Sequence, residues 1–274
     1  MKPQKTPARS PIAVRIADDL RIQIESGQRQ PGDALPTLHQ LAEQWACSTT
    51  SARTAIDLLK KQGLITGGRG KAPVVRIPPR QVVRTSKRHQ EEKDVVLQTE
   101  EIRSRRGLAE DDMDVELDEL EFTADYQTVP AGEKLAEAFD IDPSDELLQR
   151  IYEHSDPRTE RLEAWSISWI PMKLIESNPA IADPANAAWP GGTLHQLYTV
   201  GIEVIEVIDD VTASMPSTVD VERWHLPDGV PMIWCRRTSV DTEGRVVEVT
   251  DAQYPADRTV LNFHTPLKPW SSEK

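Results

Sequence analysis

One stretch near the N-terminus combines hydroxyl and cationic side chains that could contact a polyanion. Its polar members are Thr49, Thr50, Arg53, Thr54 and Lys60. Hydroxyl groups donate hydrogen bonds to phosphate oxygens, and an arginine can donate two parallel hydrogen bonds to the edge of a guanine. These residue types are therefore suited to phosphates and to base edges.

Apolar residues place this stretch on the second of two short helices. In each helix they recur every three or four positions: Leu38, Leu41, Ala42 and Trp45, then Ala52, Ala55, Ile56 and Leu59. Thr37 followed by Gln40 fits a capping box, and Ser48 stands where the second helix needs a cap. Gly63 ends that helix, as glycine commonly does. We expect two helices joined by a tight turn.

A third helix and a hairpin complete this region. Ser10-Pro11 predicts a helix start, and helical spacing of apolar residues continues to Gly27. Leu64–Thr66 and Val74–Ile77 predict two strands around a glycine-rich, cationic tip at Gly67–Lys71. Together these elements predict a three-helix core with a β-hairpin wing.

Charge is distributed unevenly along the 274 residues, a length that suits two domains. Residues 1–90 carry 16 Lys and Arg against 6 Asp and Glu, net +10, whereas the remainder carries 16 against 39, net −23. A basic N-terminal region followed by an acidic remainder is expected if only the N-terminal region contacts a polyanion. Cys47 and Cys235 lack metal-ligand spacing, which favours a reduced cytoplasmic protein without metal or cofactor. We find no membrane-spanning run and no signal peptide.

Residues 12–77 resemble the winged helix-turn-helix of GntR-type transcriptional regulators, through Pro31–Ser48, Arg53, Leu59 and the glycines Gly63 and Gly70. The resemblance implies contacts with operator DNA from the helix starts, the second helix and the wing. The residues expected to make them are Thr37, His39, Ser48, Thr49, Thr50, Arg53, Arg69, Gly70 and Lys71. His39 and Thr49 stand where the family carries arginines, so the operator should differ from its usual half-site.

The rest of the chain predicts a linker and an α+β domain. Boundaries are expected at 1–10 for a basic flexible tail, 11–78 for the DNA-binding domain, 79–94 for a linker, 95–265 for a second domain and 266–274 for a tail. Strands are expected at 117–127, 146–154, 164–171, 202–215, 231–241 and 245–254, and helices at 95–106, 131–139, 193–199 and 218–224. Hairpin-connected strands with helices set to one side indicate a mostly antiparallel sheet.

The order of these elements, and the run Arg245–Arg258, is similar to the UTRA effector-binding domain of the HutC-like branch, whose fold resembles chorismate lyase. The resemblance implies a small-molecule pocket lined by Arg150, Ser168, Glu248 and Tyr254, with Tyr152 where phosphosugar-binding relatives tend to carry a second arginine. Strand alternation places Val246, Glu248, Thr250 and Tyr254 on one face and Val247 and Val249 on the other. A neutral, partly apolar ligand would fit if several of the domain's tryptophans flank the cavity.

Three functions remain in competition. The first is a dimeric repressor that binds an inverted-repeat operator and is released by a small-molecule effector of unknown identity. The second is a DNA-binding repressor whose C-terminal domain only forms the dimer, since Glu248 could be solvated, Tyr254 a core aromatic and Arg150 an ion-pair partner. The third, an enzyme, lacks support because the sequence has no paired acid and base, nucleophile or metal motif.

Overall fold

The computed structural model describes residues 10–67, 72–104, 121–156 and 161–268. Contacts between residues divide the chain into two compact units. The first consists of Met1–Arg80 with Met215–Pro231, and the second of Gln81–Ser214 with Met232–Lys274. No helix in the described ranges is long and apolar enough to cross a membrane.

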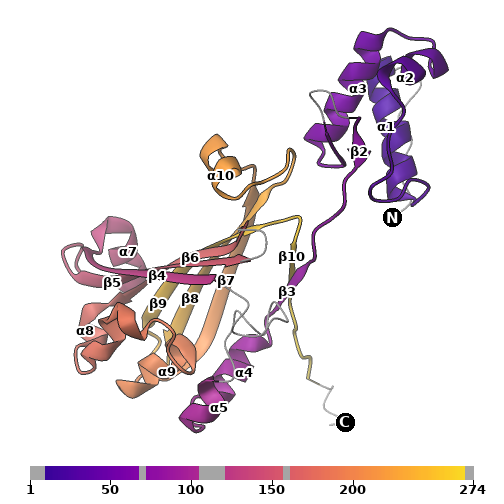
Figure 1. Cartoon of the computed structure of the whole chain (residues 1–274). Coiled ribbons are helices and arrows are strands. Elements are labelled where there is room, and N and C mark those ends of the chain that lie inside the picture. The colour runs from indigo at the N-terminus through magenta and orange to yellow at the C-terminus, as the bar shows by residue number, and fades with distance from the viewer. Residues whose placement is uncertain (1–9, 68–71, 105–120, 157–160, 269–274) are drawn as a thin grey trace, which may run out of the picture. The chain divides into compact units, whose positions relative to one another are not determined.

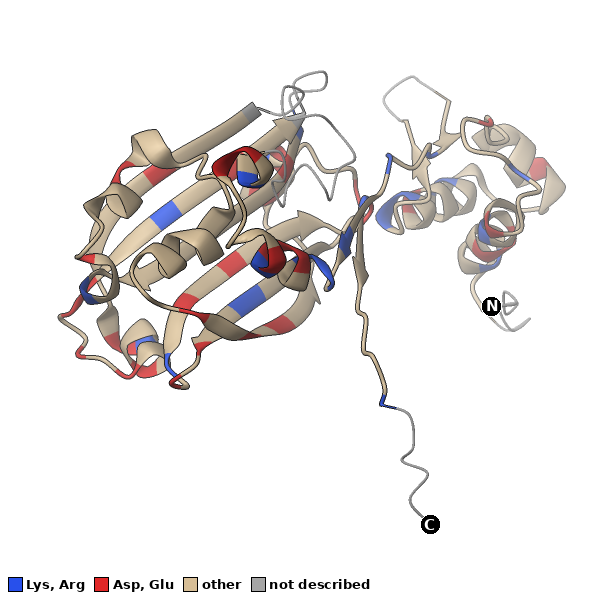
Figure 2. Ribbon diagram, turned by 90° about the horizontal axis from the view of Figure 1, so that it is seen from below, with Lys and Arg blue, Asp and Glu red and all other residues tan. Residues whose placement is uncertain are grey.

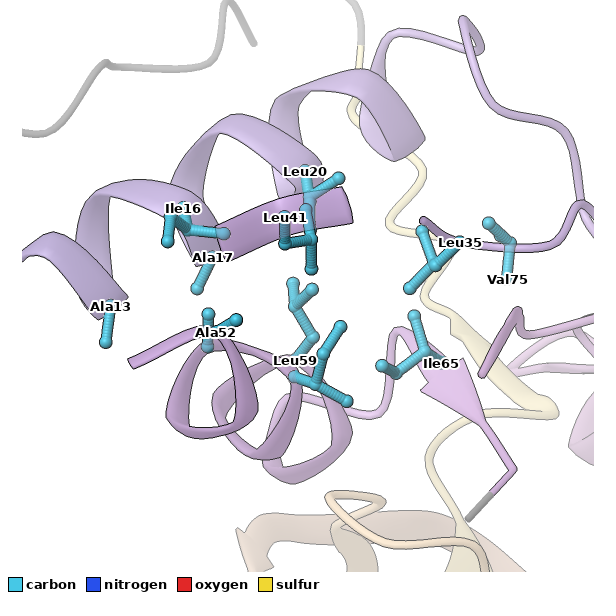
Figure 3. Close-up of a cluster of buried hydrophobic side chains, with 12 residues drawn as sticks. Ala13, Ile16, Ala17, Leu20, Leu35, Leu41, Ala52, Leu59, Ile65 and Val75 are labelled. Atoms are coloured by element: carbon cyan, nitrogen blue, oxygen red, sulfur yellow. The ribbon is translucent and has the colours of Figure 1, made fainter. Parts of the chain in front are cut away.

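Three helices form the core of the first unit, as the sequence predicts (Figure 1). They are α1 (Ile12–Glu25), α2 (Leu38–Gln44) and α3 (Thr49–Lys61). Their apolar stripes meet in one cluster that includes Ile16, Leu41 and Leu59, each at most 1% exposed, and Figure 3 shows these side chains converging between the helices. The unit also contains α10 (Thr218–Arg223), which begins with a capping box between Ser217 and Asp220.

Local signals set the ends of α2 and α3. The Thr37 hydroxyl accepts a hydrogen bond from the Gln40 amide, and the Thr37 backbone N–H donates one to Gln40 Oε1, which confirms the capping box. The Ser48 hydroxyl accepts from the Ser51 amide, which confirms the cap of α3. Between the helices Ala46 has a φ of 45°, a left-handed conformation that is strained for a residue with a Cβ atom.

The wing is present but short. Strand β1 (Ile65–Thr66) pairs with β2 (Val74–Val75) in antiparallel fashion. The expected wing-tip residues Arg69, Gly70 and Lys71 lie outside the described residues.

The second unit contains a six-stranded sheet of order β4-β5-β6-β9-β8-β7, in which all neighbouring strands are antiparallel. This confirms the predicted α+β class. The strands are β4 (Glu121–Pro130), β5 (Glu146–Asp156), β6 (Arg161–Pro171), β7 (Val204–Ser214), β8 (Met232–Asp241) and β9 (Val246–Pro255). Basic and acidic residues occur within the strands as well as in the loops (Figure 2).

Helices cover both faces of this sheet (Figure 1). On one face Leu148 and Ile170 pack with Leu197 of α9 (Gly192–Thr199) and Ile175 of α8 (Met172–Ile175). The 3₁₀ turns η2 (Pro179–Ala182) and η3 (Pro184–Asn186) lie between α8 and α9 in the chain. On the other face Leu147 packs with Phe139 of α7 (Gly132–Phe139).

One expectation about strand faces is wrong. The pairing of β8 with β9 shifts register between Ser239 and Val240. Val247 therefore packs in the cluster with Leu148 under α9, whereas Val246 packs with Val249 on the opposite face. A bulge inserts one residue into a strand and exchanges the faces of the residues beyond it. A prediction from strict alternation along the sequence cannot include such a bulge.

The segment expected to be a linker contains regular structure. It forms β3 (Val82–Thr85), which pairs in parallel with β10 (Thr259–Asn262), and α4 (Arg88–Val95). The single helix predicted at 95–106 is wrong, because α4 ends at Val95 and α5 (Glu100–Ser104) is separate. Val95 and Val96 are buried, whereas Ile102 is 42% exposed.

Candidate functional sites

The outer surface of α3 presents the polar residues that the sequence singles out. Thr49, Thr50 and Arg53 are all exposed, while Ala52, Ala55 and Leu59 of the same helix are buried. At 1.5 Å per residue the helix is about 20 Å long, which is enough to lie along a major groove about 12 Å wide. The helix therefore presents hydroxyl groups and a guanidinium group in a geometry suited to base edges and phosphates.

The capping residues have a positional role. The hydroxyl oxygens of Thr37 and Ser48 accept hydrogen bonds from their own helices, so these side chains fix the first turns of α2 and α3. His39 is exposed in the first turn of α2. Arg15 of α1 lies over the Trp45 ring, 5.7 Å from its centroid, and thereby ties α1 to the end of α2.

A row of polar residues crosses one face of the six-stranded sheet. Each member is the direct cross-strand neighbour of the next, in the order Tyr126, Arg150, Ser168, Thr250, Arg237 and Asp209. The row thus takes one residue from every strand. Arg150 and Ser168, predicted as site residues from separate strands, are brought together by this register.

Arg150 is the centre of a buried hydrogen-bond network. Its guanidinium group donates to Ser168 Oγ at 2.9 Å, to Gln196 Oε1 at 2.6 Å, to Thr193 Oγ1 at 3.1 Å and to Glu248 Oε1 at 2.6 Å. Arg150 is 1% exposed and Glu248 is 7% exposed. Four hydrogen bonds to protein acceptors use most of the five N–H groups of an arginine. The network thus joins the sheet to α9.

Tyrosines flank this network. The hydroxyl groups of Tyr152 and Tyr126 are 2.7 Å apart, and the Arg150 guanidinium carbon lies 5.7 Å from the centre of the Tyr152 ring. Burial raises the pKa of the Tyr152 hydroxyl, although nearby Arg150 acts to lower it. Burial acts to lower the pKa of Arg150, but Tyr152 and Glu248 outweigh that effect and raise it. Both groups keep their protons at neutral pH.

Helix α4 reaches the same face through Glu92. The Leu194 amide donates a hydrogen bond to the Glu92 carboxyl group, and a Cβ atom at Gly192 would lie 2.7 Å from Glu92 Oε1. Glycine at position 192 therefore allows the carboxyl group to approach the first turn of α9. Burial, assisted by the charge of Glu248, raises the pKa of Glu92 to about 7. Next to it, Lys93 donates to the Val204 carbonyl at 2.9 Å.

Tyr254 lies apart from the Arg150 network, although both are on the same face. The Arg84 guanidinium carbon lies 4.2 Å from the centre of its ring. Nearby, Arg237 donates two hydrogen bonds to Asp209, at 2.8 and 2.9 Å. The four predicted pocket residues therefore divide, with Arg150, Ser168 and Glu248 together and Tyr254 beside Arg84.

Sequence reasoning missed several residues of these clusters. Thr193 and Gln196 are three residues apart on α9, a spacing that places both on one helix face, and that pattern could have indicated a polar contact. Nothing in the sequence indicated a role for Glu92, because the apolar residues of its segment do not recur at a helical or strand spacing. Trp165 and Trp169 pair with Gln253 and Val249, so they lie on the opposite face from Arg150 and do not flank its network.

These features define a class of protein: a winged helix-turn-helix DNA-binding unit joined to an α+β unit with a buried polar cluster, as in ligand-responsive transcriptional regulators. Residues 12–75 match the family model of bacterial regulatory proteins, gntR family, and residues 123–259 match the UTRA domain. The chain belongs to the GntR family of transcriptional regulators, in the group with a UTRA domain, and is not an enzyme.

Two known proteins extend this comparison. An uncharacterized HTH-type transcriptional regulator of Streptomyces coelicolor is 24% identical over 258 residues, which cover 90% of each chain. The crystal structure of a GntR-family transcriptional regulator aligns with a TM-score of 0.68 at 22% identity, over 94% of this chain and 99% of that one. The structural similarity shows that the fold extends over both units.

Proposed function

We propose that the protein is a dimeric repressor that binds an inverted-repeat operator and leaves it when a small-molecule effector binds the sheet unit. The exposed Arg53 on α3, flanked by Thr49 and Thr50, is the observation that carries this proposal. An arginine at that place can select a guanine, while the hydroxyl groups contact phosphates or thymine methyl groups. In a two-fold dimer, two such helices enter successive major grooves about 34 Å apart.

Dimerisation is supported by the edge of the sheet. Strand β7 is an edge strand of eleven residues, and it exposes Ile205, Ile208 and Val211 by 58%, 43% and 39%. A long edge strand with apolar side chains invites pairing with another chain. A second copy of the protein would cover these apolar side chains.

Effector control is supported by the position of β3 and α4. The N-terminal part of the first unit ends at Arg80, and β3 and α4 are the next elements of the chain, both in the second unit. Glu92 and Lys93 of α4 contact α9 and β7 around the polar face. A ligand that binds under α4 would change these contacts, and α4 is the segment through which the chain continues toward the DNA-binding unit. A tenfold change in operator affinity requires a coupling free energy of only about 1.4 kcal/mol.

A second function is favoured by one specific observation. The Arg150 guanidinium group is already hydrogen-bonded to four protein acceptors, so the cluster is complete without a ligand. The UTRA unit could then serve only to form the dimer. A screen of candidate effectors by tryptophan fluorescence separates the two functions, since Trp189 donates a hydrogen bond to His195 of α9. Effector control requires a saturable fluorescence change together with release from the operator, and a purely structural unit shows neither.

A further inference from the structure

A cavity opens at the end of the six-stranded sheet where α7 and α8 lie (Figure 1). The first residues of β5 and β9 and the last residue of β6 complete its lining. Its volume is about 380 Å³, within the range of roughly 300–1,000 Å³ that is usual for small-molecule sites. Among the described residues that line it, none belongs to the Arg150 network, so the cavity is separate from that network.

The cavity has apolar walls. The two buried residues of its lining, Phe139 and Pro171, are both apolar. Ile141 and Val246 pack with Phe139 in the hydrophobic cluster on the α7 side of the sheet, and Leu174 of α8 adds further apolar surface. An apolar cavity of roughly 150 Å³ is enough to bind benzene. The larger cavity here therefore favours a ligand with a hydrocarbon body.

Both cations of the lining are already paired with carboxylates. Lys173 Nζ donates a hydrogen bond to Asp145 Oδ1 at 2.7 Å. The Arg245 guanidinium group donates two hydrogen bonds to Asp241 Oδ2, at 2.9 and 2.7 Å, and lies 3.3 Å from a carboxylate oxygen of Glu243. These pairs leave neither cation available to an anionic ligand.

Two further carboxylates of the lining, those of Asp140 and Glu146, are exposed. In the part of the chain that the structure describes, neither side chain has a hydrogen-bond or ion-pair partner. Asp140 directly follows α7 and Glu146 is the first residue of β5, so regular elements fix the positions of both. The charge that the cavity offers to a ligand is therefore negative, which favours a cationic group.

We propose that the cavity binds a small molecule with an apolar body and one ammonium group. The body packs against Phe139, Leu174 and Val246, and the ammonium group lies beside the carboxylates of Asp140 and Glu146. Because these carboxylates are exposed to water, the charge contributes selectivity more than affinity. This site is additional to the effector site of the proposed function, and its test uses no DNA.

Isothermal titration calorimetry of the full chain tests the site with three probes that share one body: 4-phenylbutylamine, 4-phenylbutanol and 4-phenylbutyrate. At low salt the amine should bind roughly three- to tenfold more tightly than the alcohol, and the butyrate should bind most weakly. Salt at about 0.5 M should reduce the advantage of the amine, since it screens exposed charges. Equal affinity for the amine and the alcohol, or tightest binding of the butyrate, would overturn the proposal.

A double variant, Asp140→Asn with Glu146→Gln, should remove the preference for the amine and leave the affinity for the alcohol unchanged. The matched control, Glu133→Gln with Glu206→Gln, replaces two exposed carboxylates outside the lining and changes the net charge by the same amount. The control should keep the preference for the amine. Loss of the preference in both double variants would assign it to long-range attraction and contradict the site.

Ala138→Trp tests the location of the site. Ala138 is an exposed residue of α7 that lines the cavity, so a tryptophan there should fill the space for the apolar body. All three probes should then bind roughly tenfold more weakly. Unchanged binding to the folded variant, or no binding of any probe to the wild type, would overturn the proposal. If Ala138→Trp does not fold, the carboxylate variants, which replace only exposed side chains, still decide it.

Discussion

Arg150 Nη2 and Glu248 Oε1 are 2.6 Å apart, and their side chains are only 1% and 9% exposed. The two residues come from β5 and β9, which are separated in the sheet by β6. A charge pair this deeply buried is costly to break, because removing one partner leaves the other uncompensated. Replacing one member of the pair should therefore change the free energy of unfolding much more than replacing both.

Arg150→Met should lower the free energy of unfolding by roughly 3–5 kcal/mol, since it leaves the Glu248 carboxylate buried without its partner. The double variant Arg150→Met, Glu248→Leu should recover much of that loss. Urea denaturation measures both. The exposed pair of Lys173 with Asp145 provides the control, and Lys173→Met should cost less than about 1 kcal/mol. Equal losses in the single and double variants would show that the buried charge is not the cause.

Glu92 should make stability depend on pH. Its pKa is about 7 in the folded protein against an ordinary value of 4.5. Between these values the unfolded chain loses the proton while the folded chain keeps it, so rising pH favours unfolding. Above pH 7 the penalty reaches about 3 kcal/mol. Glu92→Gln removes this penalty, because the amide oxygen can still accept from the Leu194 amide.

Thermal melts of the wild type and Glu92→Gln at pH 5 and pH 8 measure the effect. The variant should melt higher than the wild type at pH 8, and the two should differ little at pH 5. Glu91→Gln, at an exposed neighbouring position, is the matched control and should follow the wild type. A Glu92→Gln difference that is equal at both pH values would assign the effect to packing rather than to the proton.

The turn between α2 and α3 carries strain that glycine should relieve. Ala46 has a φ of 45°, where an L-residue with a Cβ atom is disfavoured by roughly 1–2 kcal/mol. Glycine also gives the unfolded chain more conformational entropy, which offsets part of the relieved strain. Ala46→Gly should therefore stabilise the first unit by about 0.5–1 kcal/mol. Ala42→Gly, in the interior of α2, should instead destabilise it by a similar amount. Chemical denaturation distinguishes the two, and destabilisation by both would remove the strain argument.

The helix-turn-helix was predictable from sequence because its signals are local. Thr37 with Gln40, Ser48 and Gly63 mark helix ends within one turn of chain, and the apolar stripes fix the buried faces. Most strands of the second unit were predictable for the same reason. The parallel pairing of β3 with β10 was not, because Val82–Thr85 and Thr259–Asn262 are short and distant in sequence, and neither strand signals its partner.

The site was predictable only in part. Arg150, Ser168 and Glu248 were expected from the family resemblance, and the sheet register brings them together. Gln196 and Glu92 join them through the docking of α9 and α4, which no local pattern encodes. The same limit applies to Tyr254, which shares the expected face but lies beside Arg84. Side-chain clusters built from four or more elements depend on tertiary packing.

Arg53→Ala should reduce affinity for the operator by roughly 1–3 kcal/mol and relax specificity at one base pair. Affinity for random DNA should fall much less. Lys61→Ala, an exposed cation in the last turn of α3, is the control, and should weaken operator and random DNA to similar extents through loss of phosphate attraction. Competition gel-shift titrations at fixed salt measure both ratios. An equal loss on the two DNAs for Arg53→Ala would exclude a base-reading role.

Selection of bound duplexes from a random DNA pool would show whether the protein is a dimeric, sequence-specific regulator. Purified full-length protein at near-physiological salt should enrich an inverted repeat whose half-sites are about one helical turn apart. Its half-site should depart from the family's usual one at the base pairs facing His39 and Thr49. Failure to enrich any sequence above random DNA would rule out a sequence-specific regulator.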